Sequence, residues 1–226
     1  MGQLVAKLAN EQGDEVAVII SSREAASEFD DVPNALRDCD VAIDFSVASA
    51  VARNVAACVL AKVPLVEGTT GWQADLDEVR RIVNEAGGAL VYGANFSVGV
   101  QAFYRIAALA AGLFHDLESY DAFIEEAHHK RKRDAPSGTA VQLGEIVASH
   151  LGREVPIMST RAGYIPGTHR VGFDSSADQI LLTHTARSRE GFAAGALIAA
   201  KWIVGRKGVF EFSEAFDEIL KTHPDV

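Results

Sequence analysis

The stretch PLVEGTTGWQADLDEVRRIVNEAGGALVYGANFS, residues 64–97, decides the fold of the first half of the chain. It opens with a short apolar run, Pro64–Glu67, and a glycine–threonine turn. Ala74–Glu85 has the amphipathic spacing of a helix and ends at two glycines. A second apolar run, Ala89–Tyr92, then leads into a small, polar segment. Strand, helix and strand in this order predict a right-handed βαβ unit, and hence a parallel sheet.

The residues before this stretch extend the same pattern. Apolar residues at helical spacing over 4–8 predict a helix that ends at Gly13. Val16–Ile20 is a continuous β-branched run, which predicts a strand buried on both faces. Val41–Phe45 predicts a further strand, and Ser46–Ala61 predicts the helix that follows it.

A parallel sheet binds its ligand beyond the carboxyl ends of its strands. Three small, polar segments fall at that edge and form the predicted cofactor groove: Phe45 and Ser46; Gly68, Thr69 and Thr70; Gly93, Ala94, Asn95 and Phe96. These segments predict a dinucleotide-binding domain of the Rossmann type.

The N-terminus departs from that pattern. A dinucleotide-binding domain begins with a strand and a G-x-G-x-x-G turn before its first helix. Here Met1 and Gly2 lead directly into the helix, so we interpret Gly2 as the last glycine of the turn. On this interpretation the first strand and its loop, about a dozen residues, are missing. The alternative is a shorter fold.

The pattern changes after residue 97. Val98–Phe114 predicts a long helix and Tyr120–Ala127 a strand. Three more strands follow a loop and a helix, with no helix between them: Ile157–Arg161, Thr168–Phe173 and Gln179–Thr185. Consecutive strands predict a mixed sheet in a smaller α+β domain. We predict a helix over 191–204 and a helical tail over 210–220 that packs on the first domain. The expected domains are therefore 1–97 with 205–226, and 98–204.

Composition limits the possible functions. The 226 residues carry a net charge of −10, which argues against general nucleic-acid binding. No apolar run reaches the roughly 20 residues of a membrane span, and no signal peptide is visible. Cys39 and Cys58 form no CxxC pair, so we interpret them as small buried hydrophobic residues of a cytoplasmic protein.

The densest chemical cluster is EEAHHKRKRDAPSGT, residues 125–139. Pro-Ser-Gly-Thr at the start of a helix offers backbone N–H groups and hydroxyls to a small anion, and the neighbouring cations add charge. A histidine at a strand's end can donate a proton near neutral pH. Each feature alone has a plainer explanation, a solvated basic loop or a helix N-cap. Two adjacent histidines without further ligands do not predict a metal site, and we expect ordinary surface or core roles for the other histidines, including His169 and His184.

The string EAHHKRKRDAPSGTA, residues 126–140, resembles the signature E-x-H-H-x-x-K-x-D-A-P-S-G-T-A of the dihydrodipicolinate reductases. Asp44-Phe-Ser46, Gly68-Thr-Thr-Gly71 and ANFSVG at 94–99 stand in that family's order and spacing. Arg161-Ala-Gly163 and Gly167-Thr-His169 also look like its substrate domain. The similarity covers essentially the whole chain and lacks only the family's start.

The resemblance implies an enzyme of lysine and diaminopimelate biosynthesis. It reduces 4-hydroxy-tetrahydrodipicolinate with NADPH or NADH. His128 matches the proton donor, Lys132 the catalytic lysine and His129 a substrate contact. Ser137, Gly138 and Thr139 match the turn that holds a substrate carboxylate. The segments of the predicted groove match cofactor contacts. The resemblance also implies a homotetramer built through the second domain's sheet.

The sequence leaves two questions open: which nicotinamide cofactor is preferred, and whether a different function fits the same residues. The second predicted strand ends Ile20-Ser-Ser-Arg23, and Ser with Arg23 favours a 2′-phosphate, hence NADPH, with NADH as the alternative. The rival functions are another two-domain nicotinamide oxidoreductase, or a non-catalytic dicarboxylate-binding protein.

Overall fold

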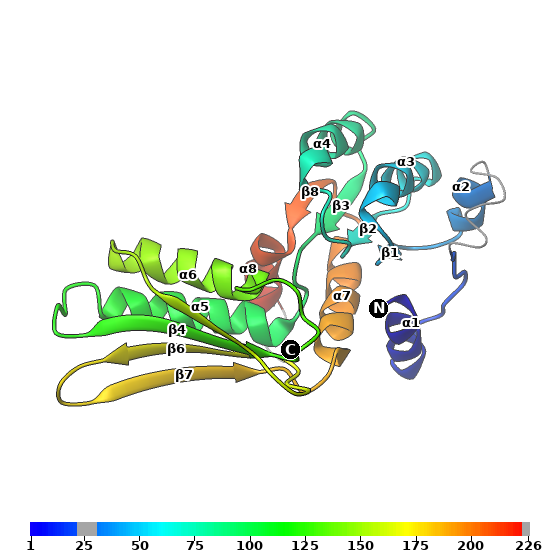
Figure 1. Ribbon diagram of the computed structural model, residues 1–226. Helices are drawn as coiled ribbons and strands as arrows, with labels where there is room; N and C mark the ends of the chain where they lie inside the picture. Colours follow the sequence, from blue (N-terminus) through cyan, green and yellow to red (C-terminus); the bar gives the residue numbers. More distant parts are fainter. Residues whose placement is uncertain (22–30, 223–226) are drawn as a thin grey trace. The chain divides into compact units, whose positions relative to one another are not determined.

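Two sheets organise the residues described by the computed structural model, which are 1–21 and 31–222 (Figure 1). The chain divides into one unit of Met1–Ser97 with Phe192–Val226, and a second of Val98–Gly191. The first contains a four-stranded sheet and the second a separate four-stranded sheet. The predicted plan of a Rossmann-like domain and a smaller mixed-sheet domain is confirmed.

The first sheet is parallel throughout, in the order β1-β2-β3-β8. Its strands are β1 (Ala42–Asp44), β2 (Leu65–Glu67), β3 (Ala89–Tyr92) and β8 (Gly208–Glu211). The helices of this unit are α1 (Gly2–Glu11), α2 (Asp31–Leu36), α3 (Val51–Ala61), α4 (Leu76–Glu85), α7 (Glu190–Ile203) and α8 (Phe212–Thr222), with 3-10 turns at Ala48–Ala50 and Gln73–Asp75. The alternation read from residues 64–97 therefore gives the expected elements, with helix starts shifted by a few residues.

Helices cover both faces of this sheet. On one face α2, α3 and α4 share a core that includes Val55, Val79 and Leu90. On the other face Val5 of α1 and Leu197 of α7 pack with β1 and the residues near it. A parallel sheet buried on both faces needs strands that are apolar on both sides, and β2 and β3 meet that need.

Two expectations for this unit are wrong. Val16–Ile20 forms no strand, and Val18, Ile19 and Ile20 are exposed. A strand needs a partner for its backbone groups, and no described segment pairs with these residues. The second error is in the tail, where Gly208–Glu211 is strand β8, paired with β3, before helix α8 begins.

The second unit is built on a mixed sheet in the order β5-β4-β6-β7. Its strands are β4 (Asp121–His128), β5 (Ile157–Arg161), β6 (Thr168–Asp174) and β7 (Gln179–Thr185). β4 pairs in parallel with β5 and antiparallel with β6, which pairs antiparallel with β7. Figure 1 shows α5 (Val98–Leu113) and α6 (Gly138–Leu151) along one face, where Ile124, Val171 and Phe173 form the core with them.

The boundary at α7 differs from the expected domains. We placed residues 98–204 in the second domain, but α7 contacts the first unit from Phe192 onward. The reason is packing: Ala193 and Leu197 lie in one cluster with α1. Gly195 lies so close to the Phe96 carbonyl that an added Cβ would stand 1.7 Å from that oxygen. No helix in the described residues is long and apolar enough to cross a membrane.

Candidate active site

The inward face of β4 changes from apolar to ionisable along the strand. Successive residues of a strand point to opposite faces, and Ala122, Ile124, Glu126 and His128 all point inward and are buried. The first two belong to the hydrophobic core. Glu126 and His128 therefore stand at the edge of that core, where the loop toward α6 begins.

Glu126 is a buried carboxylate with both oxygens bound. The Arg161 guanidinium donates to Oε2 at 2.9 Å and to Oε1 at 2.6 Å. His128 Nδ1 lies 2.5 Å from Oε2, and the Ser137 backbone N–H donates to Oε1 at 3.3 Å. Burial raises the pKa of Glu126, but the hydrogen bonds from Arg161, Ser159 and His128 outweigh it and hold that pKa at about 2. Glu126 is therefore ionised at neutral pH.

An ionised carboxylate only accepts hydrogen bonds, so the proton of the short contact lies on His128 Nδ1. Nε2 is then the atom of His128 that can take up or release a proton. Burial lowers the pKa of His128 below its ordinary value, and Glu126 opposes that shift. An anion bound beside the ring would shift this pKa upward again, because it favours the imidazolium.

His169 joins the same cluster from β6, although we expected no special role for it. Strand pairing sets His169 opposite Glu126, and its ring lies 5.1 Å from that of His128. Burial lowers the pKa of His169 to about 4, so the ring is neutral. Its Nε2 lies 3.0 Å from Ser137 Oγ.

Ser137 caps α6 and faces inward. Its Oγ accepts a hydrogen bond from the Ala140 N–H at 3.2 Å, and the side chain is buried. The hydroxyl predicted to contact the substrate directly is therefore already hydrogen-bonded inside the protein. Gly138 and Thr139 open the helix, where the first N–H groups have no acceptor within the helix. These N–H groups and the helix dipole favour an anion at this end of α6.

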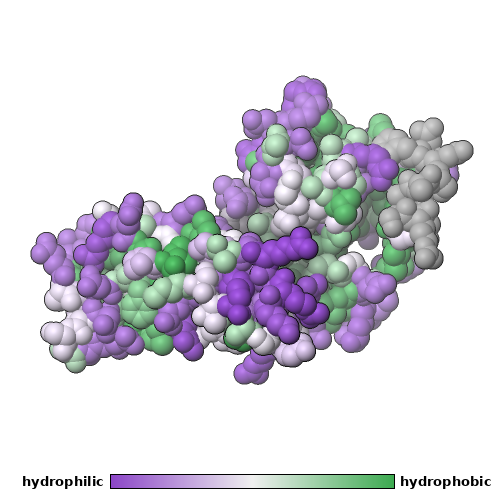
Figure 2. Space-filling view, in the orientation of Figure 1, coloured by the Kyte–Doolittle hydropathy of each residue, from purple (hydrophilic) through white to green (hydrophobic). Residues whose placement is uncertain are grey.

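The loop between β4 and α6 carries the positive charge. Lys130, Arg131 and Arg133 are exposed, and Figure 2 shows a strongly hydrophilic surface over this loop. Lys132 is half-buried and pairs with Asp134 at 2.8 Å. That bond lowers the pKa of Asp134.

His129 is half-buried, and its Nδ1 is buried without a hydrogen-bond partner among the described residues. His128, His129, Lys132, Ser137, Gly138 and Thr139 thus all lie in the strand end, loop and helix start of one segment.

Glu126, His128 and His169 also lie close enough to offer a metal ion three ligand atoms, within 4.8 Å of one another. However, both Glu126 oxygens already accept hydrogen bonds from Arg161, and a guanidinium repels a second cation. The arrangement is therefore better described as a hydrogen-bonded ion network than as a metal centre.

The first unit brings the predicted cofactor segments together at the carboxyl edge of its sheet. A cavity of about 340 Å³ is lined by Met1, Phe45–Ala48 and Gly68–Thr70. Gly68 lies under the Phe45 ring, where an added Cβ would approach Phe45 Cε1 to 2.1 Å. Gly2 is the first residue of α1, beside Met1 of the cavity lining.

Hydrogen bonds fix the two loops that line this cavity. Glu67 Oε1 accepts the Thr69 N–H at 2.7 Å, and Thr69 Oγ1 accepts the Ser46 N–H at 3.1 Å. Asp44 accepts hydrogen bonds from Ser46 Oγ at 3.1 Å and from Asn54 Nδ2 at 2.6 Å. The loops after β1 and β2 are thus tied to each other and to the strand ends.

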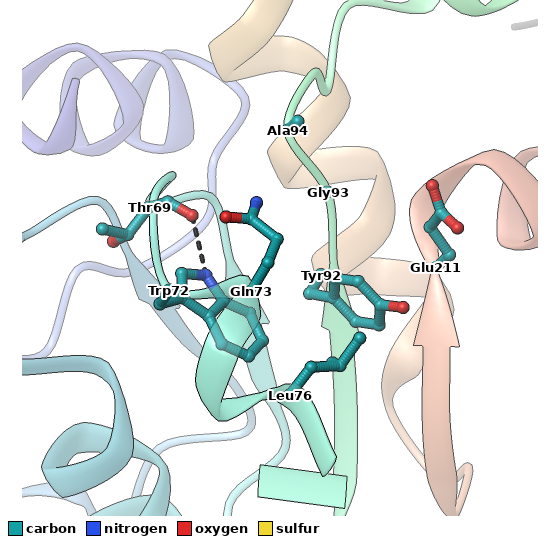
Figure 3. Close-up of a pocket in the computed structure, with 8 residues that line it drawn as sticks. All are labelled: Thr69, Trp72, Gln73, Leu76, Tyr92, Gly93, Ala94 and Glu211. Atoms are coloured by element: carbon teal, nitrogen blue, oxygen red, sulfur yellow. Dashed lines mark hydrogen bonds between the residues drawn. The ribbon is translucent and has the colours of Figure 1, made fainter. Parts of the chain in front are cut away.

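A second cavity, about 250 Å³, lies beyond β2, β3 and β8 (Figure 3). Its lining combines residues of a 3-10 turn, α4, β3 and β8 with the predicted cofactor segments: Thr69, Trp72, Gln73, Leu76, Tyr92, Gly93, Ala94 and Glu211. Figure 3 shows the Trp72 indole, which donates to the Thr69 carbonyl at 2.8 Å. Thr69 lines both cavities.

The remaining predicted cofactor residues are placed differently. Asn95 Oδ1 accepts the Ser97 N–H at 2.9 Å. The Phe96 side chain is buried between Phe45 and Phe212, with ring distances of 6.2 and 4.5 Å, so only its backbone could face a ligand. Arg23 lies outside the described residues. Sterically required glycines and a cavity lined by both apolar and polar residues at this edge fit part of a dinucleotide.

The site contains functional candidates that sequence reasoning missed. Arg161 and His169 were noticed only as parts of a resemblance, and Glu126 only as part of a string. The period of two could have found His169, since it alternates in phase with the buried Val171 and Phe173.

The chain resembles characterised proteins over most of its length. The family models for the N-terminus and the C-terminus of dihydrodipicolinate reductase match residues 1–96 and 99–216. The 4-hydroxy-tetrahydrodipicolinate reductase of Christiangramia forsetii is 39% identical over 196 residues, which are 81% of this chain and 82% of that protein. The enzyme of the same name from Acinetobacter baumannii strain AYE is also 39% identical, over 76% of this chain and 69% of its own length.

Solved structures agree with the fold. The dipicolinate-bound dihydrodipicolinate reductase from Paenisporosarcina sp. TG-14 gives a TM-score of 0.65 at 24% identity, over 76% of this chain and 71% of that one. An amine dehydrogenase from Mycobacterium smegmatis gives a TM-score of 0.60 at 10% identity, over 94% of this chain and 92% of that one. With two family models that together span almost all of the sequence, this chain belongs to the dihydrodipicolinate reductase family.

Proposed function

We propose that this protein reduces 4-hydroxy-tetrahydrodipicolinate to tetrahydrodipicolinate in lysine and diaminopimelate biosynthesis. The observation that carries the proposal is the buried Glu126–His128 pair at the end of β4, hydrogen-bonded through Glu126 to Ser137 of the PSGT turn, in a chain 39% identical to reductases of that name. The reaction consumes one hydride and one proton, and it releases one water.

The second unit supplies the proton and the carboxylate site. His128, held at Nδ1 by Glu126, delivers a proton from Nε2 to the charge that develops as hydride is added. Gly138 and Thr139 present first-turn N–H groups to one substrate carboxylate. Lys132 and His129 add positive charge and a hydrogen-bond partner beside it. Two carboxylates on the substrate explain why so acidic a protein places a half-buried cation, Lys132, beside this site.

The first unit is a nucleotide-binding domain whose residues suit a nicotinamide cofactor, which when bound supplies the hydride. We assign the contacts to Gly2, Phe45, Ser46, the loop Gly68–Thr70 and the segment Gly93–Phe96. We also propose NADPH as the preferred form, because Ser21-Ser22-Arg23 carries a cation and no carboxylate where an NAD enzyme has an acidic residue.

A turnover assay with each cofactor tests this function. We expect NADPH oxidation that depends on added 4-hydroxy-tetrahydrodipicolinate, with a lower KM than for NADH. Calorimetry with dipicolinate and with each cofactor separates the rivals. Binding of dipicolinate without binding of either nicotinamide would favour a non-catalytic dicarboxylate-binding protein. Turnover of a different carbonyl or imine substrate alone would favour another oxidoreductase.

We further propose that the protein forms a homotetramer through the outer face of the second sheet. α5 and α6 cover only one face of that sheet. The other face carries Phe123, Met158 and Leu181, and the last two are 48% and 44% exposed. Apolar residues gathered on an open sheet face favour association with another protein surface.

A further inference from the structure

Glu126 joins the two halves of the proposed substrate site through one buried carboxylate. Its Oε2 holds the His128 ring at Nδ1, and its Oε1 accepts the Ser137 N–H, directly before Gly138 and Thr139. The proton donor and the helix opening that holds a carboxylate are therefore attached to the same group. The side chain of Glu126 has no exposed surface, so it cannot touch substrate itself.

Arg161 fixes this carboxylate in place. Its two terminal nitrogens bind the two oxygens of Glu126 in a fork, and its Nη2 also donates to the Asp134 carbonyl at 2.5 Å. Parallel pairing with β5 sets Arg161 opposite His128. A planar guanidinium that donates one hydrogen bond to each oxygen restricts rotation of the carboxylate.

We propose that Glu126 is a positioning residue of the reaction, which keeps His128 in its proton-donating orientation and holds the opening of α6 in register with it. This inference rests on the proposed function of His128. Arg161 acts one step further out, because its guanidinium donates to the two oxygens of Glu126 and so orients that carboxylate, which in turn holds the His128 ring.

The chemistry requires such a residue. A neutral His128 with its proton on Nδ1 presents a bare Nε2, so it can donate only after it becomes the imidazolium. Glu126 favours that cation, as a carboxylate does in a Ser-His-Asp triad. After Nε2–H is transferred to the substrate, His128 returns to the neutral form that Glu126 already holds. Gly167 lies next to Nε2, where an added Cβ would stand at 3.1 Å.

The neighbouring charges make His128 dependent on this single carboxylate. The titratable groups around it are Lys132 on the loop, Arg161 on β5, His169 on β6 and His184 on β7. All are cationic or potentially cationic. Glu126 is the anion that raises the pKa of His128, through both its hydrogen bond and its charge, while burial, Lys132 and Arg161 lower it.

Glu126→Gln tests the proposal, because it removes the charge and nearly keeps the shape. We expect kcat for substrate reduction to fall about 10- to 1,000-fold at neutral pH. As pH rises, the remaining activity should begin to fall at a lower pH than in the wild type. The pKa of His128 is lower in this variant, because its imidazolium has lost the carboxylate that stabilises it. Nitrogen NMR should show the neutral His128 ring shifting from one tautomer to a mixture, and calorimetry should show weaker dipicolinate binding.

Glu125→Gln is the matched control. Glu125 is the preceding residue of the same strand, points to the opposite face and pairs with Arg170 at 3.2 Å. Its kcat, pH profile and His128 tautomer should match the wild type. Glu126→Asp gives a second variant that keeps the charge but shortens its reach. It should also lose kcat, while its His128 pKa stays closer to that of the wild type than the pKa of Glu126→Gln does.

Two results would overturn the proposal. One is a Glu126→Gln variant with the wild-type pH profile and His128 tautomer. The other is an activity loss that equals the loss of folded protein in both variants, with the pH profile unchanged, since that describes a purely structural role. If the wild type did not reduce the substrate, the proposed function would fail, yet the His128 tautomer and its dependence on Glu126 would still be measured independently.

Discussion

Glu67 is a carboxyl group that the fold keeps away from water at the end of β2. It is fully buried, and Asp44 is its pairing partner on β1. Burial, and then the charge of Asp44, raise the pKa of Glu67 to about 8, against the opposing hydrogen bonds from Thr69. The thiol of Cys58, whose pKa burial raises to about 12, lies close enough for the charges of Asp44 and Glu67 to raise that pKa further. Glu67 therefore carries a proton at neutral pH.

The stability of the first unit should fall as pH rises because of this group. The folded state keeps the Glu67 proton up to about pH 8, whereas the unfolded chain releases it near 4.5. Unfolding therefore releases a proton between these values, and the stabilising contribution is full below about 4.5 and lost as pH rises toward 8. Glu67→Gln should match the wild type near pH 4.5 and exceed its stability above pH 8, by up to roughly 5 kcal/mol.

Thermal and urea unfolding at pH 5 and pH 9 measure this difference. Glu85→Gln, an exposed glutamate that pairs with Arg81 on α4, is the control and should show little dependence on pH. A Glu67→Gln variant with the same stability increment at both pH values would contradict the assignment.

His128→Ala should lower kcat about 10²- to 10⁴-fold if His128 is the proton donor. Lys132→Ala should act in the same direction, because it removes the half-buried cation beside the proposed carboxylate site. Lys130→Ala, an exposed cation two residues away, is the control and should leave kcat near its wild-type value. Steady-state rates on the folded variants check this, and an unchanged kcat in both His128→Ala and Lys132→Ala would refute the assignment.

The residues of the site could be predicted from sequence only where they are local. EAHHKRKRDAPSGTA places His128, Lys132 and Ser137 within one segment, so their proximity follows from spacing. Arg161 lies 35 residues from its partner Glu126, and it arrives there only through the register of β4 with β5. A register between distant strands depends on the whole second sheet, which no local pattern encodes.

At the scale of an element, close packing of α7 fixes the position of the loop after β3. Gly195 lets the helix approach the Phe96 carbonyl so closely that an alanine Cβ would collide with backbone at 1.7 Å. Backbone atoms cannot rotate away as a side chain can, so the helix or the loop must move. Gly195→Ala should therefore cost about 1–3 kcal/mol of stability and weaken nicotinamide binding if Gly93–Phe96 makes the cofactor contacts proposed above.

Gly112→Ala provides a comparison of the same chemical change. Gly112 lies in α5, and an added Cβ there meets no atom within 4 Å. The substitution should stabilise the protein by about 0.5–1 kcal/mol, because alanine favours the helix over glycine. Chemical denaturation measures both variants, and equal effects in the two helices would contradict the packing argument.

Elements were predicted well where a neighbour in the sequence completes them. β1, β2, β3 and their helices follow one another as βαβ units, so pattern and pairing agree. Val16–Ile20 has an equally strong apolar pattern but forms no strand, because no described segment pairs with it. β8 was missed for the converse reason: its partner β3 lies more than 100 residues earlier in the chain.

At the scale of the whole molecule, the boundary between the units was misplaced at α7. The sequence shows a helix after the last strand of the second sheet, but it does not show which core that helix joins. Ala193, Gly195 and Leu197 are small or apolar residues that suit either unit by composition. Only the fit of Gly195 to the Phe96 carbonyl and of Leu197 to α1 assigns α7 to the first unit.

At the same scale, the apolar residues on the outer face of the second sheet predict that copies of the protein associate through this face. Gly172 on β6 lies under the Phe123 ring of β4, where an added Cβ would approach Phe123 Cζ to 2.2 Å, and this packing presents the ring on that face. Leu181 is paired with Gly172 from the other side and is 44% exposed. Each protomer carries a net charge of −10, so association has to come from such an apolar face and not from overall attraction.

Leu181→Asp places a carboxylate on this face, on its edge strand β7. If the face is buried between copies, that charge must be desolvated without a partner, which destabilises the assembly by several kcal/mol. We expect light scattering to give a tetramer for the wild type and a smaller species for Leu181→Asp, with little change in monomer folding. Leu60→Asp on α3, at a leucine that is 66% exposed in the first unit, should leave the mass unchanged. A monomeric wild type at micromolar concentration, or a tetrameric Leu181→Asp variant, would show that the protein does not assemble through this face.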